Sequence, residues 1–294
     1  MYSTADAVNG VRNPGLLALE LWRLYNRNLR GRTGVEIMAE DWDNLIILDA
    51  CRYDTLTELH SLQGRLRPVV SQGGTSKEFF DRNFTEDAYP NTVYVSGNSH
   101  LQRVESRFHD RLRPFKDDRD PLWPDRFDDP PDTVLPETMV EWTLDAHEEY
   151  PNKRLIAHFM QPHAPFYGDI GEQIFTRGPN WYEEVEAGNL SPRDARQAYR
   201  ETLELALPHV ETLVEELPGK TVVTADHGEL FGENIFGLAG HPGGDIYLSD
   251  LVTVPWLEIE GDERKEIVPG TATEGPTEMT DEMRETLRDL GYVV

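Results

Sequence analysis

Residues 220–229 read Lys-Thr-Val-Val-Thr-Ala-Asp-His-Gly-Glu, and their β-branched run predicts a buried strand over 220–225. The strand ends in Asp226 and His227, after which Gly228 lets the backbone turn away tightly. A carboxylate beside an imidazole at a strand end offers an oxygen and a nitrogen ligand to one metal cation.

A second buried strand is predicted at 44–48, Asn-Leu-Ile-Ile-Leu, and it runs directly into Asp49. Open α/β folds hold their ligands at the carboxyl edge of the sheet, so both strand ends are expected to meet there. An isolated Asp in this place is often a helix cap. Together, however, Asp49, Asp226 and His227 supply two carboxylates and an imidazole to one cation.

The whole chain alternates short apolar runs with amphipathic stretches, which is typical of a mostly parallel sheet covered by helices. We therefore predict an α/β fold, a three-layer α/β/α sandwich, with a lead-in at 1–40 and a catalytic domain at 41–294. Two irregular segments are expected to be loops and candidate substrate covers, 107–132, which is dense in Pro, Asp and Arg, and 167–189, which is rich in aromatics. The predicted strands are 44–48, 66–70, 92–96, 154–160, 220–225 and 253–259, and the predicted helices are 14–29, 53–62, 76–83, 135–149, 192–216 and 281–290.

The charge balance excludes several classes of function. The 294 residues carry 54 acidic and 28 basic side chains, a net charge of −26, which opposes binding to nucleic acid or to anionic lipid through the overall charge. The single cysteine, Cys51, excludes an internal disulfide and fits a reducing compartment. No apolar run is long enough to span a bilayer, so the expected location is the cytoplasm.

One amphipathic stretch at the N-terminus qualifies this expectation. Residues 16–25 are apolar and helical in pattern, and Arg27, Arg30 and Arg32 follow them. The helix either packs on its own domain, which is the favoured interpretation, or lies in a membrane interface.

Only five of the basic residues are lysines, and the acids are spread along the chain, which resembles the composition of salt-adapted, halophilic proteins. Screening should then relieve self-repulsion, since the Debye length falls from about 10 Å at 0.1 M salt to about 3 Å at 1 M. We expect the melting temperature to rise between about 0.1 M and 1 M KCl. A flat or falling melting temperature over that range would contradict salt adaptation.

Four ordered motifs together resemble the sulfatase-like branch of the alkaline phosphatase superfamily. They are Leu-Asp-Ala-x-Arg-x-Asp at 48–54, Pro-His-Ala-Pro-Phe at 162–166, Thr-Ala-Asp-His-Gly-Glu at 224–229 and Leu-Arg-Asp-Leu-Gly-Tyr at 287–292. The resemblance implies an alkaline phosphatase-like fold with a metal at the carboxyl edge of the sheet. It also implies a hydroxyl or modified side chain as nucleophile, between the first and third strands.

That interval reads Ser-Gln-Gly-Gly-Thr-Ser-Lys-Glu at 71–78. Thr75 stands where a helix should begin, and it is an N-cap candidate because Glu78 three residues later would complete a capping box. A hydroxyl at a helix N-terminus and bound to a cation is also activated for attack. Thr75 is therefore the favoured nucleophile and a metal ligand, with Ser71 and Ser76 as alternatives.

One metal site is expected, held by Asp49, Thr75, Asp226 and His227, with Zn or Mn favoured and Mg or Ca as alternatives. His163 and His241 either hold substrate oxygens or complete a second metal site. Arg52 either binds a substrate oxygen or forms a surface pair with Asp54.

The expected function is a metal-dependent hydrolase or transferase of phosphate esters, of phosphodiester or phosphoglycerol type. Its expected substrate is a small-molecule or a glycan- or lipid-linked ester. A sulfatase is the alternative, but sulfatases need a Cys/Ser-x-Pro-x-Arg signature, and neither Cys51 nor Ser71 is followed by that pattern. A non-catalytic binding module on the same scaffold is the alternative from another class.

Overall fold

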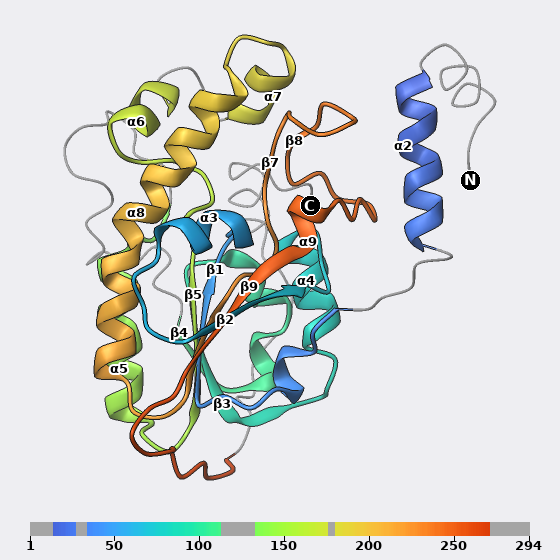
Figure 1. Ribbon diagram of the computed structural model, residues 1–294. Coiled ribbons are helices and arrows are strands. Elements are labelled where there is room, and N and C mark those ends of the chain that lie inside the picture. Colours follow the sequence, from blue (N-terminus) through green and yellow to red (C-terminus); the bar gives the residue numbers. More distant parts are fainter. Residues whose placement is uncertain (1–13, 28–33, 113–132, 176–179, 271–294) are drawn as a thin grey trace.

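A computed structural model describes residues 14–27, 34–112, 133–175 and 180–270. A central seven-stranded sheet and a two-stranded hairpin lie within these ranges (Figure 1). Their strands are β1 (Asn44–Leu48), β2 (Arg65–Val70), β3 (Tyr89–Ser96), β4 (Phe108–Leu112), β5 (Arg154–Phe159), β6 (Thr221–Thr224), β7 (Leu230–Phe231), β8 (Ala239–Gly240) and β9 (Thr253–Ile259).

The strand order in the central sheet is β2-β9-β6-β1-β5-β3-β4. β1 pairs in parallel with β5 and β6, and β3 pairs in parallel with β5 and β4. β9 runs antiparallel to both of its neighbours, β6 and β2. The predicted mostly parallel α/β fold is thus confirmed, and the carboxyl ends of β6, β1, β5 and β3 lie side by side at one edge.

Helices cover the sheet, as Figure 1 shows with α5 and α8 on one side and α4 on the other. α5 packs against β3, β5 and α8, and α3 packs against β9 and α8. The helices are α2 (Pro14–Tyr25), α3 (Tyr53–Leu59), α4 (Ser76–Asn83), α5 (Pro136–Glu149), α6 (Asp169–Phe175), α7 (Trp181–Glu186), α8 (Pro192–Glu216) and α9 (Ser249–Val252), with short 3-10 turns at Ile37–Ala39, Ser99–Arg103 and Glu105–Arg107.

The central strands are buried on both faces, which explains their nearly continuous apolar sequences. All five residues of β1 and all four of β6 are buried. An aromatic cluster that includes Phe80, Phe84, Tyr94 and Phe108 packs between α4 and the β3–β4 side of the sheet. The strand ends are therefore held on a rigid base, which is what a precise site requires.

The expectation of a loop over 167–189 is wrong, because α6 and α7 lie within it. Their apolar residues Ile174, Trp181 and Val185 pack with Tyr199 of α8 and Phe231 of β7 in a second hydrophobic cluster. Tertiary packing thus stabilises helices that are too short to form on local propensity alone.

The other predicted loop, 107–132, is wrong in its first part, because β4 adds an edge strand there. The rest of it, and the predicted helix 281–290, lie outside the described residues. The division of the chain into 1–40 and 41–294 stays a prediction.

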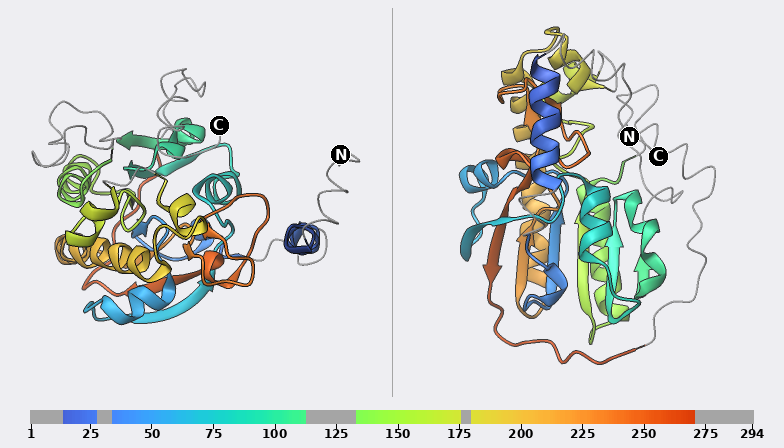
Figure 2. Two further views of the ribbon diagram at one scale, coloured as in Figure 1. Left: turned by 90° about the horizontal axis from the view of Figure 1, so that it is seen from above. Right: turned by 90° about the vertical axis from the view of Figure 1, so that its right-hand side faces the viewer.

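α2 stands beside the domain (Figures 1 and 2). Its Leu19 packs into a cluster with Leu230, Ile246, Tyr247 and Leu251. Of the helices in the described ranges, α2 included, not one combines the length and the hydropathy that crossing a bilayer needs.

Candidate active site

The functional side chains come from the carboxyl ends of four adjacent parallel strands and from the start of one helix. Because these strands share one direction, their polar C-terminal residues gather at a single edge. The contributions are Asp226 and His227 after β6, Asp49 after β1, His163 after β5, Asn98 and His100 after β3, and Ser76 at the first position of α4.

Four of these side chains form a closed cluster that is entirely buried: Asp49, Asp226, His227 and Ser76. Ser76 Oγ lies 2.7 Å from Asp226 Oδ2, 3.5 Å from Asp49 Oδ2 and 3.3 Å from His227 Nε2. His227 Nε2 lies 3.5 Å from Asp49 Oδ1 and 3.5 Å from Asp226 Oδ2. Ligand bonds of about 2.0 to 2.2 Å give a tetrahedral coordination sphere with edges of about 3.3 to 3.6 Å, so most of these spacings fit one cation.

The negative charges of the cluster also favour binding of a cation. Burial, and next the charge of Asp226, raise the pKa of Asp49 well above its ordinary value. Asp49 Oδ1 accepts no hydrogen bond from the described residues, although it is fully buried. A buried carboxylate with an unsatisfied oxygen beside a second carboxylate is costly unless a metal compensates it. The donor set therefore fits a divalent metal.

The tautomers of His227 and His163 also favour metal binding. His227 Nδ1 lies 2.8 Å from the carbonyl oxygen of Gly228, and His163 Nδ1 lies 2.5 Å from that of Ala164. A carbonyl oxygen only accepts, so each Nδ1 carries the proton and donates. Both Nε2 atoms then keep a lone pair, which is the arrangement of metal-binding histidines.

Backbone and side-chain donors hold the two carboxylates in place. Asn98 Nδ2 donates to Asp49 Oδ2 at 2.6 Å and to Ser76 Oγ at 3.1 Å. The Ala50 amide donates to Asp226 Oδ1 at 3.1 Å, and Ala50 adopts a left-handed φ of 59°. A non-glycine residue in this region costs energy, and such strain is concentrated at functional sites.

A second cluster lies beside the first and consists of His163, Glu229 and His241. One ligand atom of each lies within 4.8 Å of the others. His241 Nδ1 lies 3.3 Å from both carboxylate oxygens of the fully buried Glu229. Burial alone would lower the pKa of His241, but the charge of Glu229 outweighs it and raises this pKa. Burial, and next His241, lower the pKa of His163 well below its ordinary value.

Thr75 and Ser76 lie differently in the structure. Thr75 is the N-cap of α4, where its Oγ1 accepts the Glu78 amide at 3.2 Å, and the expected capping role is confirmed. Ser76 is the residue whose hydroxyl lies among Asp49, Asp226 and His227. The third candidate, Ser71, is engaged elsewhere, because its hydroxyl donates to the backbone carbonyl oxygen of Asp226.

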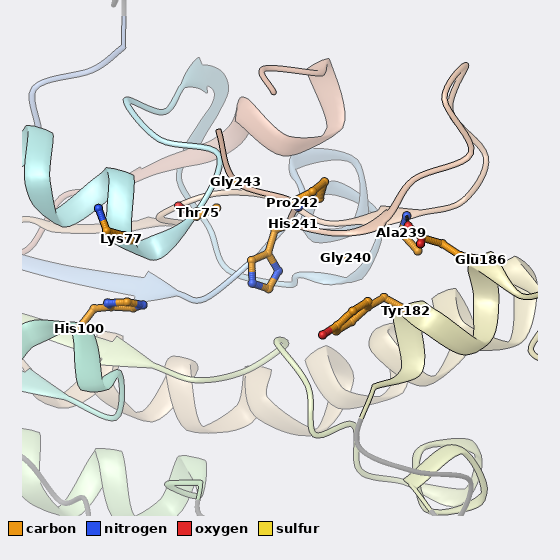
Figure 3. Close-up of a pocket in the computed structure, with 10 residues that line it drawn as sticks. All are labelled: Thr75, Lys77, His100, Tyr182, Glu186, Ala239, Gly240, His241, Pro242 and Gly243. Atoms are coloured by element: carbon orange, nitrogen blue, oxygen red, sulfur yellow. Dashed lines mark hydrogen bonds between the residues drawn. The ribbon is translucent and has the colours of Figure 1, made fainter. Parts of the chain in front are cut away.

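A pocket of about 490 Å³ opens beside the two clusters (Figure 3). His241 points into its centre, with Lys77 and His100 toward one end and Tyr182 and Glu186 toward the other. Burial is the main reason that the pKa of His100 falls to about 3, so this ring is neutral at physiological pH. The remaining lining residues are Thr75, Ala239, Gly240, Pro242 and Gly243.

No family model matches the sequence, and no curated protein matches it. Solved structures do match. The soluble domain of lipooligosaccharide phosphoethanolamine transferase A from Neisseria meningitidis is 13% identical with a TM-score of 0.50, over 74% of this chain and 76% of that chain. The C-terminal periplasmic domain of EcEptC from Escherichia coli, in complex with Zn, is 12% identical with a TM-score of 0.51, over 78% of this chain and 75% of that chain.

The chain therefore shares its fold with these two transferase domains. At these identities the match concerns the fold, and the chemistry rests on the residues. Arg52 donates hydrogen bonds of 2.9 and 2.7 Å to Asp54 and one of 3.0 Å to Asp250. It does not line the pocket.

Four residues of the site were not assigned by sequence reasoning: Asn98, His100, His158 and Glu229. His158 is fully buried. Its Nδ1 forms a hydrogen bond of 3.0 Å with the Tyr94 hydroxyl, and its Nε2 lies 3.8 Å from Asp226 Oδ2. Burial lowers its pKa to about 4, which keeps the ring neutral. Glu229 did carry a signal, since it completes the Asp-His-Gly-Glu motif, and Asn98 carried a weaker one as a polar residue just beyond a buried strand.

Proposed function

We propose that the chain is a metal-dependent hydrolase or transferase of phosphate esters in which Ser76 is the nucleophile. The position of Ser76 Oγ, 2.7 Å from Asp226 Oδ2 and within 3.5 Å of Asp49 and His227, carries this proposal. The sequence favoured Thr75 over Ser76. The distances from Ser76 Oγ to the three ligand side chains favour Ser76, and Thr75, which caps α4 and lines the pocket, is the alternative nucleophile.

Asp49, Asp226, His227 and Ser76 would hold the metal. When bound, the metal supplies positive charge that lowers the pKa of a coordinated hydroxyl and stabilises negative charge on phosphoryl oxygens. Zn or Mn suits the mixed oxygen and nitrogen donors best. A second site at His163, Glu229 and His241 offers donors of the same kinds.

Each of these residues has a separate role in the displacement at phosphorus. Ser76 Oγ directs its proton toward Asp226 Oδ2 and attacks phosphorus, while the bond from phosphorus to the leaving alcohol breaks and that alcohol takes up a proton. The phosphoryl group formed on Ser76 lies at the N-terminus of α4, where backbone amides favour an anion. His163 and His241 would hold the phosphoryl oxygens.

Water completes the reaction as a hydrolase, and an acceptor alcohol completes it as a transferase. In either case the second attack breaks the bond between phosphorus and Ser76 Oγ and returns a proton to the serine. Phosphate is favoured over sulfate because Ser76 is followed by Lys-Glu-Phe, which lacks the Pro and Arg of the sulfatase signature. The pocket volume suits a substrate group of small-molecule size, including the head of a glycan- or lipid-linked ester.

The test compares aryl phosphate diesters, aryl phosphate monoesters and aryl sulfates after chelation and reloading with Zn, Mn or Mg. We expect turnover of at least one phosphate ester to exceed that of the sulfate by about 100-fold or more. Enzymes commonly discriminate between related substrates by factors of this size. His227→Ala serves as the control for contaminating phosphatases and should be inactive. Turnover of the sulfate alone would overturn the assignment to phosphate esters.

A further inference from the structure

α2 has two apolar faces, and one of them is exposed. Leu19 packs on the domain and is 8% exposed. Leu17, Leu21, Leu24 and Tyr25 are 46, 59, 37 and 46% exposed. Since each residue advances by about 100° around a helix, these four positions lie within about 100° of one another, opposite to Leu19. We call them the outer face of α2.

The helix is attached to the rim of the active-site pocket. Asn26 Nδ2 donates to the Asp245 carbonyl oxygen at 2.9 Å, and Arg27 pairs with the Asp245 carboxylate at 2.8 Å. Gly243, two residues before Asp245, lines the pocket. The outer face is therefore fixed relative to the pocket, and the views in Figure 2 show α2 next to the domain on that side.

The charge of this stretch is the reverse of that of the chain. Residues 14–35 contain four arginines and a single glutamate, in a protein whose net charge is −26. Arg27 remains 57% exposed while it pairs with Asp245. An apolar stripe with Tyr25 at one end, next to these arginines in an otherwise acidic sequence, fits the surface of an anionic lipid bilayer.

We propose that the outer face of α2 binds the surface of an anionic lipid bilayer and so holds the pocket close to it. A second copy of the chain is a poorer occupant. One face of a 12-residue helix buries far less than the roughly 800 Å² per partner of a stable interface, and two chains of charge −26 repel. Binding to a bilayer requires only that the outer face of α2 inserts. Acidic groups of the chain that lie farther from the lipid than the Debye length, about 10 Å at 0.1 M salt, are screened from its charge.

The experiment is flotation of the full chain with vesicles of phosphatidylcholine containing phosphatidylglycerol, and with vesicles of phosphatidylcholine alone. It is run at the lowest KCl concentration at which the melting curve shows a folded protein. We expect co-flotation with the anionic vesicles, and binding to the neutral vesicles at least about fivefold weaker, because each arginine near an anionic surface adds to the attraction.

Leu17→Ser combined with Leu21→Ser should lower the bound fraction at least about tenfold, because two inserted side chains lose their apolar contact with lipid. Leu205→Ser is the matched control, since Leu205 is an equally exposed leucine (48%) on α8. It should float like the unaltered chain. Circular dichroism should show unchanged melting in all variants, since every altered side chain is exposed.

Three results would overturn the proposal. They are no flotation of the unaltered chain with either vesicle, equal flotation of the double variant, and a dimer in light scattering that the double variant abolishes. The measurement does not depend on turnover. Ser76→Ala should float normally, so failure of the proposed chemistry and failure of the lipid contact are separable.

Discussion

Ser76→Ala is expected to lower kcat by at least about 10⁴-fold, whereas Thr75→Ala should lower it by about tenfold at most. The reason is that a nucleophile has no substitute, and removal of one in a well-studied hydrolase costs more than that. Thr75→Ala should instead cost about 1 kcal/mol of the free energy of unfolding, since it removes an N-cap bond to the Glu78 amide. The measurements are steady-state kinetics on the best phosphate ester and a denaturant titration of each variant.

The covalent intermediate gives a second measurement of the same assignment. A reaction quenched in acid should leave one phosphoryl group on the tryptic peptide that ends at Lys77, with fragmentation placing it on Ser76. Thr75→Ser is the matched control and should keep both the adduct and most of the rate. Phosphate on Thr75, together with an active Ser76→Ala variant, would show that Thr75, which the sequence favours, is the nucleophile.

The strand ends could be predicted because β-strand burial leaves a direct mark on sequence. β1 and β6 are buried on both faces, so their apolar runs stand out, and the polar residue after each run must lie at the edge of the sheet. The parallel arrangement then brings Asp49, Asp226 and His227 together. That part of the site follows from periodicity and topology alone.

The choice between Thr75 and Ser76 could not be made in this way. Both stand at the start of α4, and both satisfy the requirement for a hydroxyl in the right interval. One step along a helix rotates the side chain by about 100°, so the N-cap faces its own third amide while the next residue faces the strand ends. Only the position of α4 on the sheet, fixed by packing of Phe79 and Phe80, decides which hydroxyl reaches the cluster.

Glu229 and α6 show two other limits of sequence reasoning. Glu229 follows Gly228, where the backbone passes so close to Asp250 that a Cβ would lie 2.0 Å from its carbonyl oxygen. This close approach is a tertiary contact without a local pattern. α6 likewise depends on contacts of Ile174 with residues far along the chain, and its composition resembles that of a loop.

Asp226→Asn is expected to remove the metal and, at the same time, to stabilise the metal-free protein. Asp49 and Asp226 are both fully buried, and the charge of Asp226 contributes to the raised pKa of Asp49. Without a cation their repulsion destabilises the folded state, so one neutral amide should relieve it. Elemental analysis should show about one metal per chain in the unaltered protein and less than about a tenth of that in the variant, because a single lost ligand weakens binding severely.

The melting temperature separates a metal site from a merely buried acidic pair. A cation at about 100 times its Kd stabilises the native state by about 2.7 kcal/mol, which corresponds to a rise of about 4 °C for a chain of this size. We expect that rise for the unaltered protein, and no rise for Asp226→Asn, whose metal-free form should already melt higher. His163→Ala is the control, since it leaves the Asp49, Asp226 and His227 donors intact and should keep the metal-dependent rise. Undiminished metal content and an undiminished rise in Asp226→Asn would show that these strand ends do not form the binding site.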